Sequence, residues 1–269
     1  MPKALRSVPL VLFLAVACGG PDLTDADQAD LEYGTSVHKL PLRDASAPLP
    51  QATSAHLTYY GGKVLSSVKV VQVLYGSGTY AAPVSQMAAF YGGVTKSTYM
   101  DWLKEYDTPK QSIGRGSFAK KVSITPSASR DKASISDASI QAEISAQIGK
   151  GTLPAPDGNT LYMVNFPKGK TITQGGSKSC VGGGFCAYHG TFKRNSTEVF
   201  YGVLPDMSAG SGCDQGCGSG SALANQTSVA SHEMIESVTD AEVGLATKLG
   251  SPLAWYDSTN GEIGDICNG

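Results

Sequence analysis

The order of apolar and polar residues predicts short strands and helices separated by loops rich in glycine and serine. Residues 68–75 (VKVVQVLY) are β-branched and almost continuously apolar, which is typical of a buried strand. Further strands are expected at 118–124, 160–166 and 198–204, and short helices at 84–91 and 98–106. The Gly- and Ser-rich residues 175–190 and 208–221 are expected to be loops. Because strands and helices interleave without a regular βαβ period, the pattern favours the α+β class.

Two segments predict longer helices. Residues 136–148 begin with a Ser-Asp pair and then repeat isoleucine every four residues, which indicates an amphipathic helix. Residues 222–239 contain helix-forming residues and neither Gly nor Pro. At about 100° per residue, His232, Glu233 and Glu236 fall on one side of this second helix. The opposite side is apolar and is formed by Ala230, Met234, Ile235 and Val238.

The polar side of the second helix carries the candidate chemistry. His232 and Glu236 are one turn apart, so both side chains can reach a single ion. The HExxH helix of zinc peptidases holds its metal in this way, and its first glutamate, here Glu233, is the general base. A carboxylate can replace the second histidine because it binds zinc at about 2.0–2.2 Å, and its charge also suits harder metals such as manganese. The alternative is a solvated helix face that shows this spacing by chance.

A third metal ligand is expected from the acidic tail of the chain. Glu262, which lies 26 residues after Glu236, ranks first because gluzincins take their third ligand from a downstream glutamate. The alternatives, as ligands or as residues that orient a ligand, are Asp240, Asp257, Asp265 and His189. Asp240 can serve only if the chain turns back after the helix. The acidic and polar residues of 257–265 could instead form a small calcium loop.

The N-terminus has the features of an export signal. Two basic residues precede an apolar run at 8–16, and small residues follow, so residues 1–17 are expected to be a signal peptide. Cys18 comes directly after Ala15-Val16-Ala17, which resembles a bacterial lipoprotein box and predicts lipidation of Cys18. Gly19, rather than aspartate, at the next position favours sorting to the outer membrane. The alternative is plain secretion after cleavage near Ala17.

Composition divides the remainder into a linker and one folded domain. Residues 18–56 are rich in Asp, Pro, Ala and Ser and poor in apolar residues, so they are expected to be a tether or a pro-segment. The folded domain is expected at 57–269. Removal of residues 1–17 leaves 19 basic and 23 acidic residues, a net charge of −4, which argues against nucleic-acid binding. No run of about 18 apolar residues predicts a membrane span.

The cysteines agree with an oxidising compartment. Of six cysteines, one belongs to the lipoprotein box, and the other five predict two disulfides and one free thiol. Local pairs Cys180–Cys186 and Cys213–Cys217 are expected, because each would close a Gly-rich loop. A four-cysteine zinc site is the alternative.

Several of these motifs resemble a known family. Residues 102–108, 153–154, 186–189 (CAYH) and 213–217 (CDQGC) occur in the order found in plant exordium (phosphate-induced) proteins, and the likeness covers roughly residues 65–245. The plant proteins lack the histidine and both glutamates of 231–240. In that segment the chain instead resembles bacterial and fungal exported proteins with SHExxExxTDP, WYD and Glu-x-x-Asp-x-Cys motifs, although Ala241 replaces the usual proline.

The resemblance implies a zincin-like α+β fold, with a mixed sheet, a long metal-binding helix and Gly-rich disulfide loops. The first functional hypothesis is an exported zinc (or manganese) peptidase that acts on peptides or proteins. Its metal would be held by His232, Glu236 and Glu262, with Glu233 as general base and a residue such as His189 as oxyanion donor. The second hypothesis is a non-catalytic cell-envelope binding protein of the exordium type.

Overall fold

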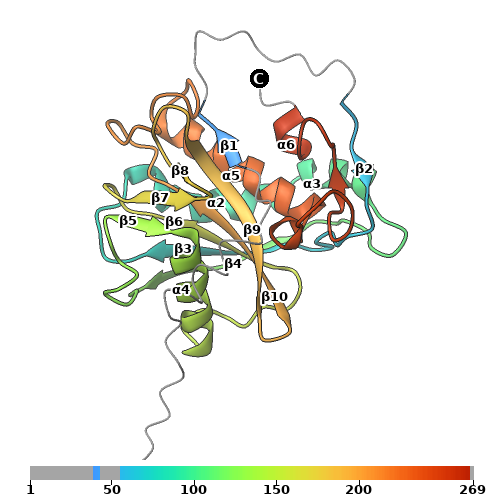
Figure 1. The fold of residues 1–269 in the computed structure, drawn as a ribbon, viewed down its shortest axis with the longest axis horizontal. Helices are drawn as coiled ribbons and strands as arrows, with labels where there is room; N and C mark the ends of the chain where they lie inside the picture. The colour runs from blue at the N-terminus through green and yellow to red at the C-terminus, as the bar shows by residue number, and fades with distance from the viewer. Residues whose placement is uncertain (1–38, 43–54, 267–269) are drawn as a thin grey trace, which may run out of the picture.

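A six-stranded sheet runs through the centre of the computed structural model, which describes residues 39–42 and 55–266 (Figure 1). In spatial order its strands are β1 (Lys39–Pro41), β9 (Phe185–Arg194), β10 (Thr197–Leu204), β6 (Thr160–Asn165), β3 (Lys69–Tyr75) and β4 (Ser117–Ile124). The β10, β6, β3 and β4 strands are parallel, whereas β9 runs antiparallel to both β10 and β1. The sheet is therefore mixed, and the predicted α+β class is confirmed.

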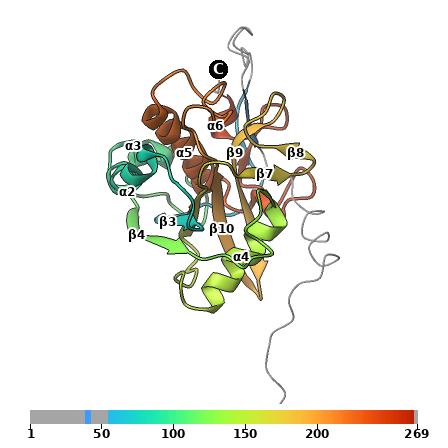
Figure 2. The ribbon, with the colours of Figure 1, turned by 90° about the vertical axis from the view of Figure 1, so that its left-hand side faces the viewer.

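Helices cover both faces of this sheet (Figure 2). One face carries α2 (Ala82–Val94) and α5 (Ala222–Thr239), and the other carries α4 (Asp137–Gly149). The shorter helices are α3 (Tyr99–Trp102), η1 (Leu103–Tyr106), η2 (Val243–Leu245) and α6 (Ile263–Ile266). Two small sheets pair β2 (Thr58–Tyr59) with β11 (Trp255–Tyr256), and β7 (Thr171–Gln174) with β5 (Ser134–Ser136) and β8 (Ser177–Lys178).

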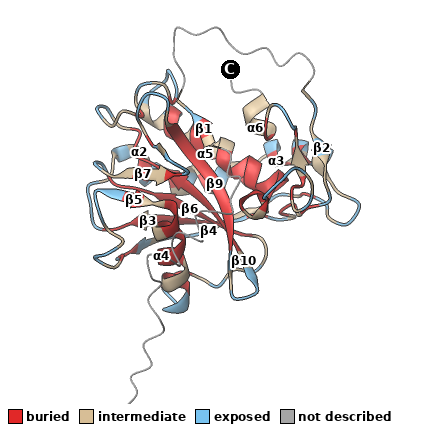
Figure 3. Ribbon diagram, viewed as in Figure 1, coloured by how far each residue is buried: buried red, intermediate tan, exposed pale blue. Residues whose placement is uncertain are grey.

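The alternation of β9 decides which of its side chains reach α5. Ala187 belongs to the apolar core on the α5 side, and Tyr188 belongs to the core on the α4 side. Because successive strand residues point to opposite faces, the next residue, His189, again faces α5. Both β9 and α5 are buried over most of their length (Figure 3). An ionisable side chain therefore lies between a buried strand and a buried helix.

The prediction of a loop at 175–190 is wrong over its second half. Strand β9 begins at Phe185, and β8 occupies Ser177–Lys178. The first eight residues of β9 are all buried, because helices cover the sheet on both faces. A strand buried on both faces does not show the apolar and polar alternation of a half-exposed strand, so its pattern is hard to distinguish from that of a loop rich in small residues.

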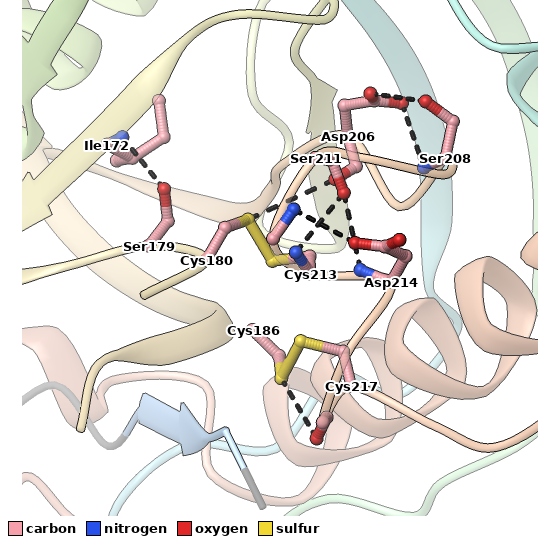
Figure 4. Close-up of a disulfide and its surroundings, with 12 residues drawn as sticks. Ile172, Ser179, Cys180, Cys186, Asp206, Ser208, Ser211, Cys213, Asp214 and Cys217 are labelled. Atoms are coloured by element: carbon pink, nitrogen blue, oxygen red, sulfur yellow. Dashed lines mark hydrogen bonds between the residues drawn. A yellow bond between two sulfur atoms is a disulfide. The ribbon is translucent and has the colours of Figure 1, made fainter. Parts of the chain in front are cut away.

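The predicted disulfide pairing is also wrong. The bonds join Cys180 to Cys213 and Cys186 to Cys217, so each connects the segment around the start of β9 with the segment before α5 (Figure 4). The two loops pack against each other instead of each closing on itself. They approach so closely at Gly212 that an added Cβ would lie 2.2 Å from the Cys180 carbonyl oxygen.

Other N- and C-terminal predictions concern residues that the structure describes only in part. Of the predicted tether, Lys39–Pro41 forms β1 and pairs with β9 at the edge of the sheet. The signal peptide at 1–17, the lipidation site Cys18 and the remaining cysteine, Cys267, lie outside the described residues. Among the described helices, none combines the length and the apolar character needed to cross a membrane.

Candidate metal centre

Helix α5 spans the residues predicted for it and presents the HExxE segment toward β9 and the tail. Ser221 caps its start, because the side-chain oxygen accepts a hydrogen bond of 3.2 Å from the Ala224 amide. The apolar side of the helix is buried in the core, with Ala230 and Met234 fully inaccessible. The opposite side faces β9, β10 and α6, because Glu233 lies near His189 and Gly202, and Glu236 lies near His189 and Gly264. The helix therefore carries its polar residues into the interior and not into solvent.

Three donors form a group at the edge of the interior, which we call the outer group: His232, Glu236 and Asp265. The Nε2 atom of His232 lies 3.0 Å from Oε1 of Glu236 and 3.6 Å from Oδ1 of Asp265. The His232 side chain keeps 11% of its surface exposed. The spacing of four residues thus places imidazole and carboxylate side by side, as predicted, and the tail adds a second carboxylate.

A second group, which we call the inner group, is fully buried and consists of His189, Glu236 and Glu262. Nδ1 of His189 lies 3.5 Å from Oε2 of Glu236, and Nε2 lies 3.3 Å from Oε1 of Glu262. Glu233 also approaches this histidine, with its Oε2 atom 3.4 Å from Nδ1. The imidazole of His189 therefore lies among the two carboxylates of the inner group and the carboxylate of Glu233.

Several atoms of the two groups and of the adjacent Glu233 are buried without a hydrogen-bond partner. They are Nε2 of His189, Oε1 of Glu233, Oε1 of Glu236 and both carboxylate oxygens of Glu262. Among the described residues, the ion-pair partners of the three glutamates are His189 and His232. Burial of carboxylates is costly unless cations or hydrogen bonds compensate it. Histidine nitrogens and carboxylate oxygens are also ligands of zinc and manganese, so these residues fit a divalent cation.

Burial and mutual repulsion shift the pKa values of these side chains. Burial raises the pKa of Glu233 and that of Glu262 to about 7. For Glu236, the neighbouring imidazoles of His189 and His232 outweigh burial and lower the pKa. Burial alone would lower the pKa of His232, but the neighbouring carboxylates of Asp265 and Glu236 raise it to about 11. The pKa of His189 is likewise raised against the effect of burial, chiefly by the charge of Glu262.

The tail reaches α5 because of one glycine. An added Cβ on Gly264 would lie 2.5 Å from Nδ1 of His232 and 2.7 Å from Oε1 of Glu236. The backbone of α6 therefore rests directly on the outer group. The same short helix places Asp265 beside its own first turn, where its Oδ2 atom accepts a 3.3 Å hydrogen bond from the Glu262 amide.

Two other predicted candidates lie outside both groups. Asp257 holds the tail loop together, because its Oδ1 accepts hydrogen bonds from the amides of Thr259 and Asn260, and these lower its pKa to about 2. A calcium ion in this loop would have to displace those donors. Asp240 ends α5 and accepts a 2.8 Å hydrogen bond from the Ala254 amide, while burial raises its pKa.

A pocket of about 300 Å³ opens beside the outer group. Its lining includes His232 and Ile235 of α5, Ile263 and Gly264 of α6, and Tyr99 and Trp102 of α3. Trp102 is 71% exposed. A second pocket, of about 510 Å³, shares Ile263, Glu105 and Tyr106 with the first. Solvent thus reaches the cluster from the side of His232, along a surface that is mostly apolar and aromatic.

Most of these residues were predicted from the sequence, but their division into an outer and an inner group was not. His232, Glu236 and Glu262 were expected to hold one ion, whereas Glu262 lies with His189, and Asp265 lies with His232. His189, expected as an alternative ligand, an orienting residue or an oxyanion donor, is buried among carboxylates, a place that suits a ligand best. Gly264 was not predicted, although a glycine between two acids of the tail is a signal of close approach by the backbone.

The close contact of Gly264 leads to a first prediction. Gly264→Ala should weaken Zn²⁺ binding about 10- to 100-fold, the scale typical of residues that orient ligands, because the new methyl group displaces His232 and Glu236. Competition with a chromogenic chelator measures the affinity. Gly93→Ala is the matched control, because an added Cβ there meets nothing within 4 Å. Equal affinities of the two variants would contradict the contact.

A second prediction concerns pH. Folding raises the pKa values of Glu233 and Glu262 from 4.5 to about 7. Between pH 4.5 and pH 7, both carboxyl groups are therefore ionised in the unfolded chain but protonated in the folded chain. The metal-free protein therefore loses stability as the pH rises through this range. Glu236, whose pKa is lowered, stabilises the folded chain above pH 4.5, and this contribution is lost as the pH falls below 4.5. Metal binding needs ionised carboxylates and neutral imidazoles, and the pKa values of His232 and His189 are raised, so binding strengthens as the pH rises through this range.

The gap in melting temperature between Zn²⁺-loaded and chelated protein should thus widen from about pH 5 to about pH 7.5. Differential scanning calorimetry at a series of pH values measures it. A gap that stays constant with pH would show that the buried glutamates do not take part.

Comparison with protein-family models, with curated proteins and with solved structures found no match to this chain.

Proposed function

We propose that this chain is an exported metal-dependent peptidase with a zincin-like fold. One observation carries the proposal: histidine and carboxylate donors from α5, β9 and the tail, several with buried atoms that lack hydrogen-bond partners, meet at the HExxE helix beside a pocket lined by His232. A cluster of buried acids that served stability alone would be expected to find hydrogen-bond donors. Buried acids without hydrogen-bond partners, next to a histidine that lines an opening, fit a cation and a substrate.

The cation next to the pocket would be held by His232, Glu236 and Asp265. Zinc is the metal that this donor set fits best, and manganese is the alternative because two of the three ligands are carboxylates. When bound, such an ion supplies Lewis-acid polarisation of a peptide carbonyl and lowers the pKa of water.

Glu233 is suited to act as the general base. Burial raises its pKa to about 7, so at neutral pH the carboxylate can accept a proton and later return it to the leaving amine. His189 lies 3.4 Å from its Oε2 atom and fixes the orientation of the side chain. Because Glu233 follows His232 directly in α5, the proton acceptor and the ligand at the pocket are held by the same rigid helix.

The pocket supports a peptide or protein substrate with apolar side chains. Its walls offer Tyr99, Trp102, Ile235 and Ile263, and the second pocket continues the surface past Tyr106. An extended peptide needs such a continuous surface on one side of the bond that is cut. For localisation, we propose cleavage of residues 1–17 and either lipidation at Cys18, which would attach the protein to the outer membrane, or secretion. The two disulfides support an oxidising compartment.

The test of this function is hydrolysis of a mixed peptide library by the full chain. Hydrolysis should be lost after chelation and restored by Zn²⁺ or Mn²⁺, because the donors cannot polarise a carbonyl alone. Mass spectrometry of the products measures cleavage and shows which side chains flank the cut. A protein that binds metal but cleaves no peptide would overturn the proposal in favour of an exordium-type binding protein of the cell envelope.

A further inference from the structure

The two groups of donors share one residue, and the geometry of that residue separates them. Oε1 of Glu236 faces His232 at 3.0 Å, and Oε2 faces His189 at 3.5 Å. The two oxygens of a single carboxylate therefore point at two different imidazoles, one at the pocket and one in the interior. Each imidazole has a further acid beside it, Asp265 in the outer group and Glu262 in the inner group.

We propose that the centre binds two divalent cations bridged by Glu236, one in the outer group and one in the inner group. This inference extends the proposed function, which needs only one cation at the pocket. In two-metal hydrolases the ions lie about 3.5–4 Å apart, a separation that a bridging carboxylate can span. Each position here offers one imidazole nitrogen and two carboxylate oxygens, a donor set found in zinc and manganese sites.

The charge of the cluster supports two ions over one. When ionised, Glu233, Glu236, Glu262 and Asp265 carry four negative charges, which two divalent cations neutralise if the histidines are neutral. A single cation in the outer group would leave the buried carboxylates of Glu233 and Glu262 with His189 as their one ion-pair partner among the described residues. Uncompensated buried charge is strongly destabilising. Both oxygens of Glu262 lack hydrogen-bond partners, which the outer position alone does not remedy.

Metal content of the full chain tests the inference. After saturation with Zn²⁺ and removal of the excess, elemental analysis should find two ions in the parent and one in Glu262→Gln and in Asp265→Asn. Glu236→Gln should retain less than one. Glu242→Gln is the matched control, because Glu242 follows α5 but belongs to neither group, and it should keep two ions. Circular dichroism shows which variants are folded, and the two single-group variants suffice if Glu236→Gln does not fold.

Electron paramagnetic resonance of Mn²⁺ gives a second readout that is independent of activity. Two ions that share a carboxylate are close enough for their electron spins to interact, so the spectrum at two equivalents should differ from twice the spectrum at one equivalent. A simple doubling would overturn the shared bridge. If the parent bound one Zn²⁺ per chain, and both Glu262→Gln and Asp265→Asn lost it, the two-ion centre would be overturned, but a peptidase with one metal ion would remain possible. Two bound ions without any hydrolysis would contradict the proposed peptidase function but support the two-ion centre.

Discussion

Glu233→Gln is expected to lower peptide hydrolysis by about 10²-fold or more, the scale of a lost general base. Glutamine has nearly the same size and helix propensity as glutamate but cannot take a proton from water. Because Glu233 belongs to neither donor group, the metal content should stay close to that of the parent. Rates on a cleaved library peptide, measured with the Zn²⁺ content of the same samples, give both quantities.

Glu242→Gln serves as the control for this experiment as well, since it removes a carboxylate near the end of α5 without touching either group. Its rate should equal that of the parent. If Glu233→Gln hydrolysed peptides as fast as the parent, the activity would come from another site or from a contaminant.

His232→Ala is expected to abolish hydrolysis together with the ion at the pocket. The variant removes one of three outer donors, the one that lines the pocket. Stability should fall too: at a Zn²⁺ concentration of about 100 times Kd, binding to the native state contributes about 2.7 kcal/mol. Elemental analysis, peptide hydrolysis and thermal melts with and without Zn²⁺ measure the three effects.

His56→Ala is a suitable comparison, because His56 lines the second pocket but belongs to neither group. It should keep the full metal content and the Zn²⁺-dependent gain in melting temperature. A His232→Ala protein that retained both the ion at the pocket and the activity would remove this residue from the site.

The sequence predicted elements more reliably than their arrangement. Helix α5 spans the residues expected of it, because a segment with periodic apolar residues and no Gly or Pro has few other choices. Strand β9 was not predicted at all, since tertiary burial on both faces removes the alternation by which strands are recognised. The disulfide pairing could not be read from spacing, because it depends on which loops pack together in the fold.

The same division applies to the site. The relation of His232 to Glu236 follows from helix geometry and was predictable within α5. The positions of His189, Glu262 and Asp265 depend on how β9 and the tail fold onto that helix, and no local pattern encodes this. The sequence could therefore name the donors but could not divide them into two groups.

The two disulfides, which join the segment around the start of β9 to the segment before α5, bear on when the candidate centre becomes rigid. Cys186 lies on β9 three residues before His189, and its partner Cys217 lies five residues before α5 begins. This bond ties the strand that carries one imidazole to the helix that carries the other. In a reducing cytoplasm the bond is absent, so the strand and the helix are held together by packing alone. Under the proposed export, the precursor would carry all the donors, but the disulfide that ties β9 to the segment before α5 would form only after the chain leaves the cytoplasm.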